Sequence, residues 1–534
     1  MEFDLIIRGG MLFDGTGEQA IRADIGVVDG KIVRIGDLTA ESAGVVVDAT
    51  GKHVSPGFID IHTHSDISAL YHPDQESIVS QGVTTQIVGN CSLCLGLATE
   101  SPIFHMERRW VEAYGATIDW DSVDGHFQRV SDTGISTNYV MLAGQGTLRK
   151  RVMDLSDQPP TEQEMSAMKK LLDESLDAGV WGLSTGLEYT PSRYAGIPEL
   201  SELTKLVAVR GGMYASHLRN EGDTLEEAVA EAIEIGERSG AAVQLSHHKA
   251  EGRQNWGKVH KTLKQVEEAR ARGLDVQLDQ YPYTAFQTSL AVQTLPGWAN
   301  DGDTDAILAR IADPDLRAKM VSEILAAHPD WDDLGVGCYW ESVAIGASRQ
   351  NRSLQGKTVA DIARERGGNP VEVVLDVLVE CKNFVSAVNF AICEEDIATI
   401  MSHPYTMIGS DAVGTSPFGK MSEDRVHPRS YGTFPRVLAR YVRHLGLLSE
   451  AVAIRKMTSM AADRMNIPKR GYLRESYFAD ITVYDPAHVQ DVADFQDSHR
   501  FAVGIEHVFV NGRQVWASGA HTGARPGLVL RKNA

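Results

Sequence analysis

Eight apolar stretches that alternate with helical segments constrain the fold of this chain more than any other feature. Their composition predicts buried strands, and the stretches between them, such as 161–178 and 225–239, have the apolar spacing of helices. Strands that alternate with helices form parallel βαβ units, and about eight units over about 400 residues fit a (β/α)8 barrel. The predicted strands are 58–61, 84–88, 139–142, 182–184, 213–217, 243–247, 274–279 and 406–411.

Both ends of the chain have a different pattern, with short strands joined by tight turns. Asp29-Gly30 separates two apolar runs near the N-terminus, and Asn511-Gly512 does the same near the C-terminus. Such dipeptides favour two-residue hairpin turns. We therefore expect an α/β protein in which 1–57 and 468–534 form a small β-sandwich domain beside a TIM-type barrel over 58–467. Residues 298–348, rich in Asp, Pro and Trp, are expected to form an inserted segment.

The composition excludes several classes of partner. The chain has 534 residues with 51 Lys and Arg against 72 Asp and Glu, a formal charge of −21, so neither a nucleic acid nor a membrane surface is expected as a partner. No apolar run approaches the ~18 residues of a membrane span, and no signal peptide is visible. Five cysteines do not make a disulfide framework. We expect a cytoplasmic protein, and the oligomeric state stays open.

Metal-binding side chains follow the first predicted strand. His62-Thr63-His64 comes directly after that strand, and the alternation of an extended chain places both imidazoles on one face. Two imidazoles at this spacing can bind one cation, because Zn–N bonds are ~2.0–2.1 Å long. Asp60 is expected to orient one of these imidazoles through its second nitrogen, and its alternative role is a plain hydrogen bond at the end of the strand.

Three further residues at strand ends complete a candidate metal site. Cys91 follows the second strand, and His217 and His247 each end a later strand. In a barrel enzyme the carboxyl ends of the strands meet at one face, so these side chains are expected to converge with His62 and His64. A buried cysteine is more often inert, but a Cys91 thiolate between two zinc ions would bridge them.

Asp411 ends the last predicted strand. A carboxylate that faces a metal-activated water can accept its proton and then donate it to a leaving amine. The alternative role is an N-cap, since Asp often caps the helix that follows a strand. His248 follows His247 but points to the opposite face, so it is assigned to packing.

These residues and the motifs around them resemble the amidohydrolase superfamily, and specifically its N-acyl-D-amino-acid deacylases (D-aminoacylases). The resemblance covers essentially the whole chain. PGFIDIHTHSD at 56–66 marks the superfamily, whereas SHHK at 246–249, DQYPY at 279–283 and HPRSYGTFPRVL at 427–438 are more specific. In two places the chain departs from the family: it has Ser-Leu-Cys at 92–94 where the family has Gly-Phe-Ser, and its segment 298–348 is longer.

The resemblance implies zinc-dependent hydrolysis of N-acyl-D-amino acids to a carboxylate and a D-amino acid. It implies one tight zinc site formed by Cys91, His217 and His247. It also implies a second, weaker position formed by His62, His64 and Cys91.

The resemblance further implies how the small-molecule N-acyl amino acid is bound. Asp411 would be the general base and acid, and Tyr189 would help to hold the scissile carbonyl. Four residues would bind the substrate α-carboxylate, namely Lys249, Tyr283, Ser289 and Arg429.

Two other functions remain open. A cyclic-amide hydrolase such as a hydantoinase or a dihydroorotase would share the fold, but those enzymes typically bridge their metals with a carboxylated lysine, and no obvious lysine stands at a strand end here. A non-catalytic, assembly-forming relative would be expected to have lost metal ligands, whereas all are present. The preferred side chain and acyl group are not fixed by the sequence.

Overall fold

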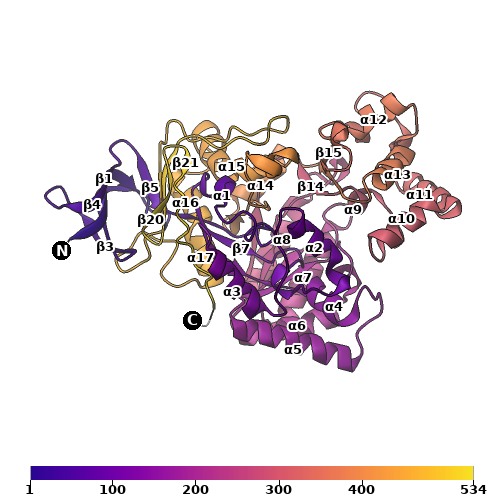
Figure 1. Cartoon of the computed structure of the whole chain (residues 1–534), viewed down its shortest axis with the longest axis horizontal. Coiled ribbons are helices and arrows are strands. Elements are labelled where there is room, and N and C mark those ends of the chain that lie inside the picture. The colour runs from indigo at the N-terminus through magenta and orange to yellow at the C-terminus, as the bar shows by residue number, and fades with distance from the viewer. Residues whose placement is uncertain (1, 533–534) are drawn as a thin grey trace.

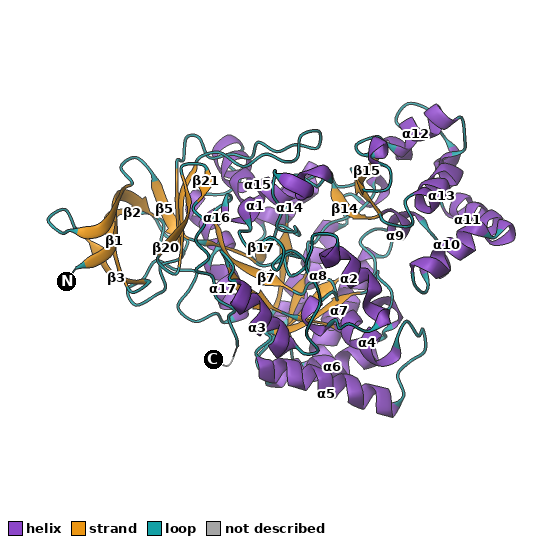
Figure 2. Cartoon of the chain, viewed as in Figure 1, coloured by secondary structure: helices purple, strands orange, loops and turns teal. Residues whose placement is uncertain are grey.

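The computed structural model describes residues 2–532. A β-sheet domain, a barrel and a mainly helical subdomain follow one another along the long axis of the molecule, with the barrel in the middle (Figure 1, Figure 2). Among the described residues, no helix combines the length and the apolar character needed to cross a membrane. The cytoplasmic location expected from the sequence stays a prediction.

The predicted barrel of parallel strands is confirmed. Two sheets, β6-β7-β8 and β9-β10-β11-β12-β13-β17, share the ring, and β9 continues β8 after one residue. A bridge between Thr63 and Ala412 closes the ring beyond β17 and β6. The strands are β6 (Phe58–Asp60), β7 (Val83–Val88), β8 (Asn138–Met141), β9 (Ala143–Gly144), β10 (Gly182–Gly186), β11 (Met213–His217), β12 (Ala242–Leu245), β13 (Val276–Gln280) and β17 (Thr406–Ile408).

Amphipathic helices cover the outside of the barrel. In α5 (Glu162–Ala178), Met168, Leu172 and Leu176 are buried at the four-residue spacing of one helix face. Thr161 begins this helix with a capping box, and Gly179 ends it with a φ of 106°. The other covering helices include α3 (Val123–Thr133), α6 (Ile197–Val209), α7 (Leu225–Ser239), α8 (Val259–Ala271) and α14 (Glu394–Ser402).

Both ends of the chain build one nine-stranded sheet, as predicted. β5 pairs antiparallel with β18, and this pairing joins the N-terminal strands to the C-terminal ones. The sheet contains β1 (Phe3–Leu12), β2 (Ile21–Val28), β3 (Lys31–Gly36), β4 (Ala43–Asp48), β5 (His53–Pro56), β18 (Ile481–Tyr484), β19 (Ile505–Val510), β20 (Arg513–Ala517) and β21 (Ala520–His521).

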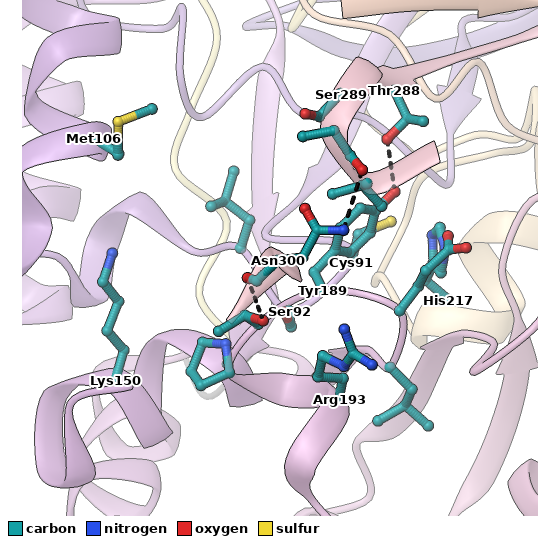
Figure 3. Close-up of a pocket in the computed structure, with 18 of the residues that line it drawn as sticks. Cys91, Ser92, Met106, Lys150, Tyr189, Arg193, His217, Thr288, Ser289 and Asn300 are labelled. Carbon is teal, nitrogen blue, oxygen red and sulfur yellow. Dashed lines mark hydrogen bonds and ion pairs between the residues drawn. The ribbon is translucent and has the colours of Figure 1, made fainter. Parts of the chain in front are cut away.

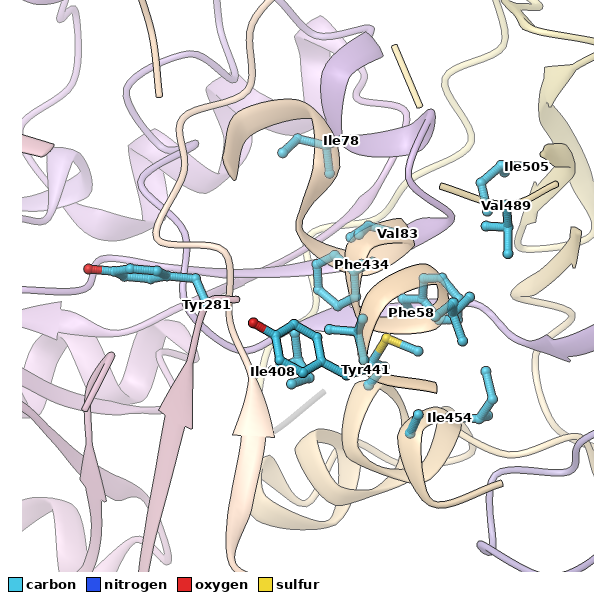
Figure 4. Close-up of a cluster of buried hydrophobic side chains, with 14 of the residues drawn as sticks. Phe58, Ile78, Val83, Tyr281, Ile408, Phe434, Tyr441, Ile454, Val489 and Ile505 are labelled. Carbon is cyan, nitrogen blue, oxygen red and sulfur yellow. The ribbon is translucent and has the colours of Figure 1, made fainter. Parts of the chain in front are cut away.

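A continuous apolar core fixes this sheet domain to the barrel (Figure 4). Phe58 on β6 stacks on Phe434 with ring centroids 5.6 Å apart. Ile505 on β19 and Tyr441 belong to the same buried cluster. Burial of this apolar surface stabilises the two units together.

The inserted segment near 298–348 is part of a larger subdomain between β13 and β17. The apolar core of this subdomain is formed by residues between Leu290 and Ala387. The sequence did not indicate its full extent, because the apolar faces of α12 and α13 have the same spacing as those of barrel helices. Its strands are β14 (Phe286–Ser289), β15 (Val343–Ser348) and β16 (Val385–Asn389), and its α-helices are α9 (Leu290–Thr294), α10 (Thr304–Ala312), α11 (Pro314–Ala327), α12 (Val359–Arg366) and α13 (Pro370–Glu380).

A substitution at Trp340 tests whether the subdomain has a packed core of its own. Its side chain is fully buried and donates a hydrogen bond of 2.6 Å to the Trp331 carbonyl. Trp340→Ala should lower the free energy of unfolding of the subdomain by about 3–5 kcal/mol, measured by urea denaturation. Val336→Ala, at a fully exposed position of the same subdomain, is the control and should change it little. Equal effects of the two variants would contradict a separate packed core.

Candidate metal centre and substrate cavity

The residues predicted to bind metal or to catalyse lie together at the carboxyl end of the barrel. They follow five different strands, β6, β7, β11, β12 and β17. All of them line one cavity except His62, which is buried directly behind Cys91. The structure therefore brings together the whole predicted set, namely His62, His64, Cys91, His217, His247 and Asp411.

Cys91 lies between the histidines. Its Sγ is 3.3 Å from His62 Nε2 and 3.5 Å from His247 Nε2. The His247 ring in turn lies 4.6 Å from the His217 ring, centroid to centroid. The thiol sulfur is thus placed to be shared by two metal positions, one on the His62 side and one on the side of His217 and His247.

Asp411 connects this cluster to a cation. Its Oδ1 lies 3.1 Å from His64 Nε2 and 3.5 Å from His62 Nε2. Its Oδ2 lies 2.6 Å from Arg429 Nη1. One oxygen of the carboxylate therefore faces the histidines, and the other faces a guanidinium group.

The backbone at the cluster is strained. Cys91, His247 and Asp411 have φ values of 52°, 33° and 54°, in the left-handed region that residues with a Cβ rarely adopt. Gly186 on β10 lies so close that a Cβ there would stand 2.3 Å from the Cys91 carbonyl oxygen. Strain of this kind is typical of functional sites, where the surrounding fold aims particular side chains at one point.

Two glutamates that the sequence analysis missed support the histidines. Glu221 Oε1 lies 3.0 Å from His247 Nδ1, and Glu188 Oε2 lies 3.0 Å from His217 Nε2. Glu221 also accepts a hydrogen bond of 2.5 Å from Lys249 Nζ. Carboxylates in these positions orient imidazoles and raise their basicity. The available signal was the acidic residue four positions after His217.

The expectation that Asp60 orients an imidazole is wrong. Its carboxylate accepts hydrogen bonds from the main chain of His62 and from Ser410, so it fixes the backbone at the end of β6. Asp279 on β13 lies nearest the imidazole instead, with Oδ1 3.4 Å from His62 Nδ1. His248 is buried against Thr262, as the packing assignment predicts.

The cluster changes the acidity of its members. Burial raises the pKa of the Cys91 thiol, but the charges of His62 and His247 outweigh it and hold that pKa well below its usual range. Burial likewise raises the pKa of Asp411, and Arg429 and His64 more than reverse the effect. A thiolate and a carboxylate are therefore favoured, and both are the forms that bind a metal ion.

The donor set fits zinc. Donor atoms of His62, Cys91, His247 and Asp411 all lie within 4.8 Å of one another. Imidazole nitrogen, thiolate sulfur and carboxylate oxygen are the ligands that zinc takes in proteins. Among the residues that the structure describes, His217 Nδ1 is one of several buried nitrogens without a hydrogen-bond partner, so it too is free to bind.

A cavity of about 1150 Å³ opens above the cluster (Figure 3). Lys249, Ser289, Arg429 and Tyr189, four of the residues expected to contact substrate, line it together with the metal-binding residues. Tyr189 packs against His217 with ring centroids 4.8 Å apart, and its hydroxyl lies 3.2 Å from Thr288 Oγ1.

Tyr283 does not line the cavity, and its assignment to the carboxylate site is wrong. The Tyr283 amide donates to the Tyr281 carbonyl (3.0 Å), so the chain turns and directs the Tyr283 side chain toward Pro428, where its hydroxyl donates to the main chain. Tyr281 takes the expected position, with its ring 5.0 Å from the Arg429 guanidinium and 5.8 Å from Lys249 Nζ. In the part of the chain described here, the buried Tyr281 hydroxyl has no hydrogen-bond partner.

Known proteins share this architecture. The profile described as "Amidohydrolase family" matches residues 45–516. D-aminoacylase of Alcaligenes xylosoxydans xylosoxydans is 35% identical, and the alignment covers 100% of this chain and 98% of that protein. The crystal structure of N-acyl-D-glutamate deacylase from Bordetella bronchiseptica, complexed with zinc and a phosphonate mimic of the tetrahedral intermediate, is similar with a TM-score of 0.83 and 34% identity. That similarity covers 99% of this chain and 100% of the deacylase.

A more distant structure is similar in fold alone. Dihydropyrimidinase from Brevibacillus agri matches with a TM-score of 0.55 and 14% identity over 98% of both chains.

Cys91 tests the metal centre. Cys91→Ser should sharply lower the zinc content of the purified protein, measured by elemental analysis, because it removes the donor that lies between the two groups of histidines. Cys94→Ala is the matched control, since Cys94 is also buried but its sulfur contacts Met141. Full zinc content in Cys91→Ser would contradict the assignment.

Proposed function

Because the chain belongs to the amidohydrolase family, we propose that it is a zinc-dependent hydrolase that cleaves N-acyl-D-amino acids into a carboxylate and a D-amino acid. The observation that carries the proposal is the position of Asp411, whose carboxylate lies between His64 and Arg429. One residue thus joins a metal-binding cluster to a cation suited to a substrate carboxylate. The names of the matched D-aminoacylase and N-acyl-D-glutamate deacylase support the same reaction.

We assign the tight zinc position to Cys91, His217 and His247, and the weaker one to His62, His64 and Cys91. When bound, zinc polarises the scissile carbonyl and lowers the pKa of a water toward ~7.

Asp411 moves the proton. Its carboxylate accepts a proton from the attacking water and then donates it to the leaving nitrogen. Arg429 holds the pKa of Asp411 low in the free protein. A substrate carboxylate that shares this guanidinium weakens its hold on Asp411, so the pKa of Asp411 rises when substrate binds and the carboxylate becomes a better base.

Arg429 and Lys249 anchor the substrate α-carboxylate. The planar Arg429 fork can bind both carboxylate oxygens, and Lys249 adds a point charge. The unpaired Tyr281 hydroxyl between them is a third donor, and Ser289 lies at the edge of the same site. In the free protein Arg429 pairs with Asp411 and Lys249 pairs with Glu221, so these cations would hold a substrate carboxylate by direct hydrogen bonds rather than by a net positive region.

Tyr189 is placed to hold the scissile carbonyl. Burial, followed by the charges of Glu188 and Cys91, raises the pKa of its hydroxyl well above the usual value, so the group stays protonated. A protonated phenol beside His217 can donate a hydrogen bond to the carbonyl oxygen as negative charge develops there.

The cavity gives less support to a cyclic-amide hydrolase. Among its described lining residues the lysines are Lys150 and Lys249. Lys150 pairs with Glu107 at 2.8 Å and Lys249 pairs with Glu221 at 2.5 Å, so each amine is already held by a carboxylate. Cys91, whose Sγ lies 3.3 Å from His62 Nε2 and 3.5 Å from His247 Nε2, would supply the bridging donor instead. A complete donor set likewise argues against a non-catalytic relative.

Asp411 gives the direct test of the chemistry. Asp411→Asn should lower kcat by about 10²–10⁴-fold on an N-acetyl-D-amino acid, because the amide cannot accept the proton. Zinc content should stay close to that of the unmodified protein, since Cys91, His217 and His247 remain. Substantial turnover in a zinc-loaded Asp411→Asn protein would sink the assignment.

Removing one hydroxyl at a time distinguishes the roles of Tyr281 and Tyr283. Tyr281→Phe should raise KM about tenfold, because it removes a hydrogen bond to a charged group, while kcat changes less. Tyr283→Phe should leave KM unchanged, since that hydroxyl contacts only the Pro428 carbonyl at 3.4 Å. Steady-state kinetics on one N-acetyl-D-amino acid compares them, and the reverse order of effects would restore Tyr283 to the carboxylate site.

A further inference from the structure

A second cavity of about 470 Å³ adjoins the metal centre on one side. It shares His64, Asp411 and Arg429 with the main cavity but does not reach Cys91, His217 or His247. Its walls come from the loops after β6 and β17, from α2 (His105–Glu112), and from β15 and β16 of the inserted subdomain.

Most of the surface that lines this cavity is apolar. Tyr71 and Tyr114 stack with ring centroids 4.4 Å apart, and Trp110, Phe384 and Met421 complete the wall. We call this space the aromatic lobe. Its apolar surface suits a bulky apolar group, which would bury its own surface there.

One cation in the wall of the aromatic lobe is neutralised by an ion pair. Arg349 lies there with its guanidinium 4.6 Å from the Tyr114 ring centre. Asp424 is paired with it at 2.6 Å, and Tyr114 donates a hydrogen bond of 3.0 Å to the same carboxylate. Two more guanidinium groups lie in the wall: that of Arg429 pairs with Asp411, and that of Arg425 donates to the main-chain carbonyls of Gln355 and Gln496.

The position of the lobe selects the amino-acid half of the substrate. On the proposed function, on which this inference rests, Asp411 protonates the leaving nitrogen and Arg429 holds the α-carboxylate. Both residues line the lobe as well as the main cavity. The substituent that enters it is therefore the one on the carbon between that nitrogen and that carboxylate.

We propose that the aromatic lobe binds the side chain of the D-amino acid and gives this enzyme a preference for bulky apolar or aromatic residues over small and acidic ones. Ala347 on β15 and Asp424 are then specificity-determining residues, because the first limits the space and the second neutralises Arg349. The known relatives named above differ in this same property, since one of them is named for D-glutamate.

The first test fills the lobe. The purified zinc-loaded protein is assayed on N-acetyl-D-tryptophan and N-acetyl-D-alanine, and kcat/KM for tryptophan should be at least about tenfold higher. Ala347→Phe should reduce that ratio by about tenfold or more. Ala309→Phe, at an exposed position of α10 outside both cavities, is the control and should leave the ratio unchanged.

The second test changes the charge. Asp424→Asn leaves Arg349 without its counter-ion, so kcat/KM for N-acetyl-D-glutamate should rise relative to N-acetyl-D-leucine by about tenfold. The role of the lobe would be overturned, and the proposed function left intact, if the protein hydrolysed all these D-substrates without a size preference and neither variant changed the ratios of kcat/KM. The role would also be overturned if Ala347→Phe changed only the preference between N-phenylacetyl-D-alanine and N-acetyl-D-alanine, because the acyl group would then occupy the lobe. No turnover of any D-substrate would overturn the proposed function itself.

Discussion

The hydrogen bond from the Asp411 amide to the His62 carbonyl, 2.8 Å long, joins the last strand of the barrel to the first. When a parallel barrel closes, the carboxyl ends of all its strands meet at one face, however far apart the strands lie in the sequence. Here it places Asp411, to which we assign the proton transfer, beside a candidate metal ligand, His62, that comes 349 residues earlier. The cluster, the cavity and the substrate cations all depend on this closed ring.

Buried charges around the ring are paired, and the pairing fixes their geometry. Glu221 holds both His247 and Lys249, so one carboxylate sets the orientation of a metal ligand and the position of a substrate cation. Asp411 and Arg429 form a second pair of this kind. A buried charge without a partner is costly, so each pair is retained as a unit. On the proposed function, an anionic substrate would share Arg429 with Asp411, and this would link recognition to proton transfer.

The sequence predicted the barrel and the metal cluster well, because both follow from the residue at the end of each strand. Tyr283 was assigned from the resemblance to the family alone, and the resemblance did not distinguish it from Tyr281; the turn made by the Tyr283 amide and the Tyr281 carbonyl directs the Tyr283 side chain away from the cavity. Glu188 and Glu221 lie in loops after strands, where spacing does not fix direction. The subdomain was underestimated because α12 and α13 have the same apolar periodicity as the helices that cover the barrel.

The central claim is that the cavity hydrolyses a linear amide of a D-amino acid. The most direct measurement compares kcat/KM of the zinc-loaded protein for N-acetyl-D-leucine, N-acetyl-L-leucine and the cyclic hydantoin of D-leucine. The account predicts hydrolysis of the D-acyl compound with a preference of at least about 10²-fold over the other two. Equal rates for the two enantiomers, or faster opening of the hydantoin, would contradict it.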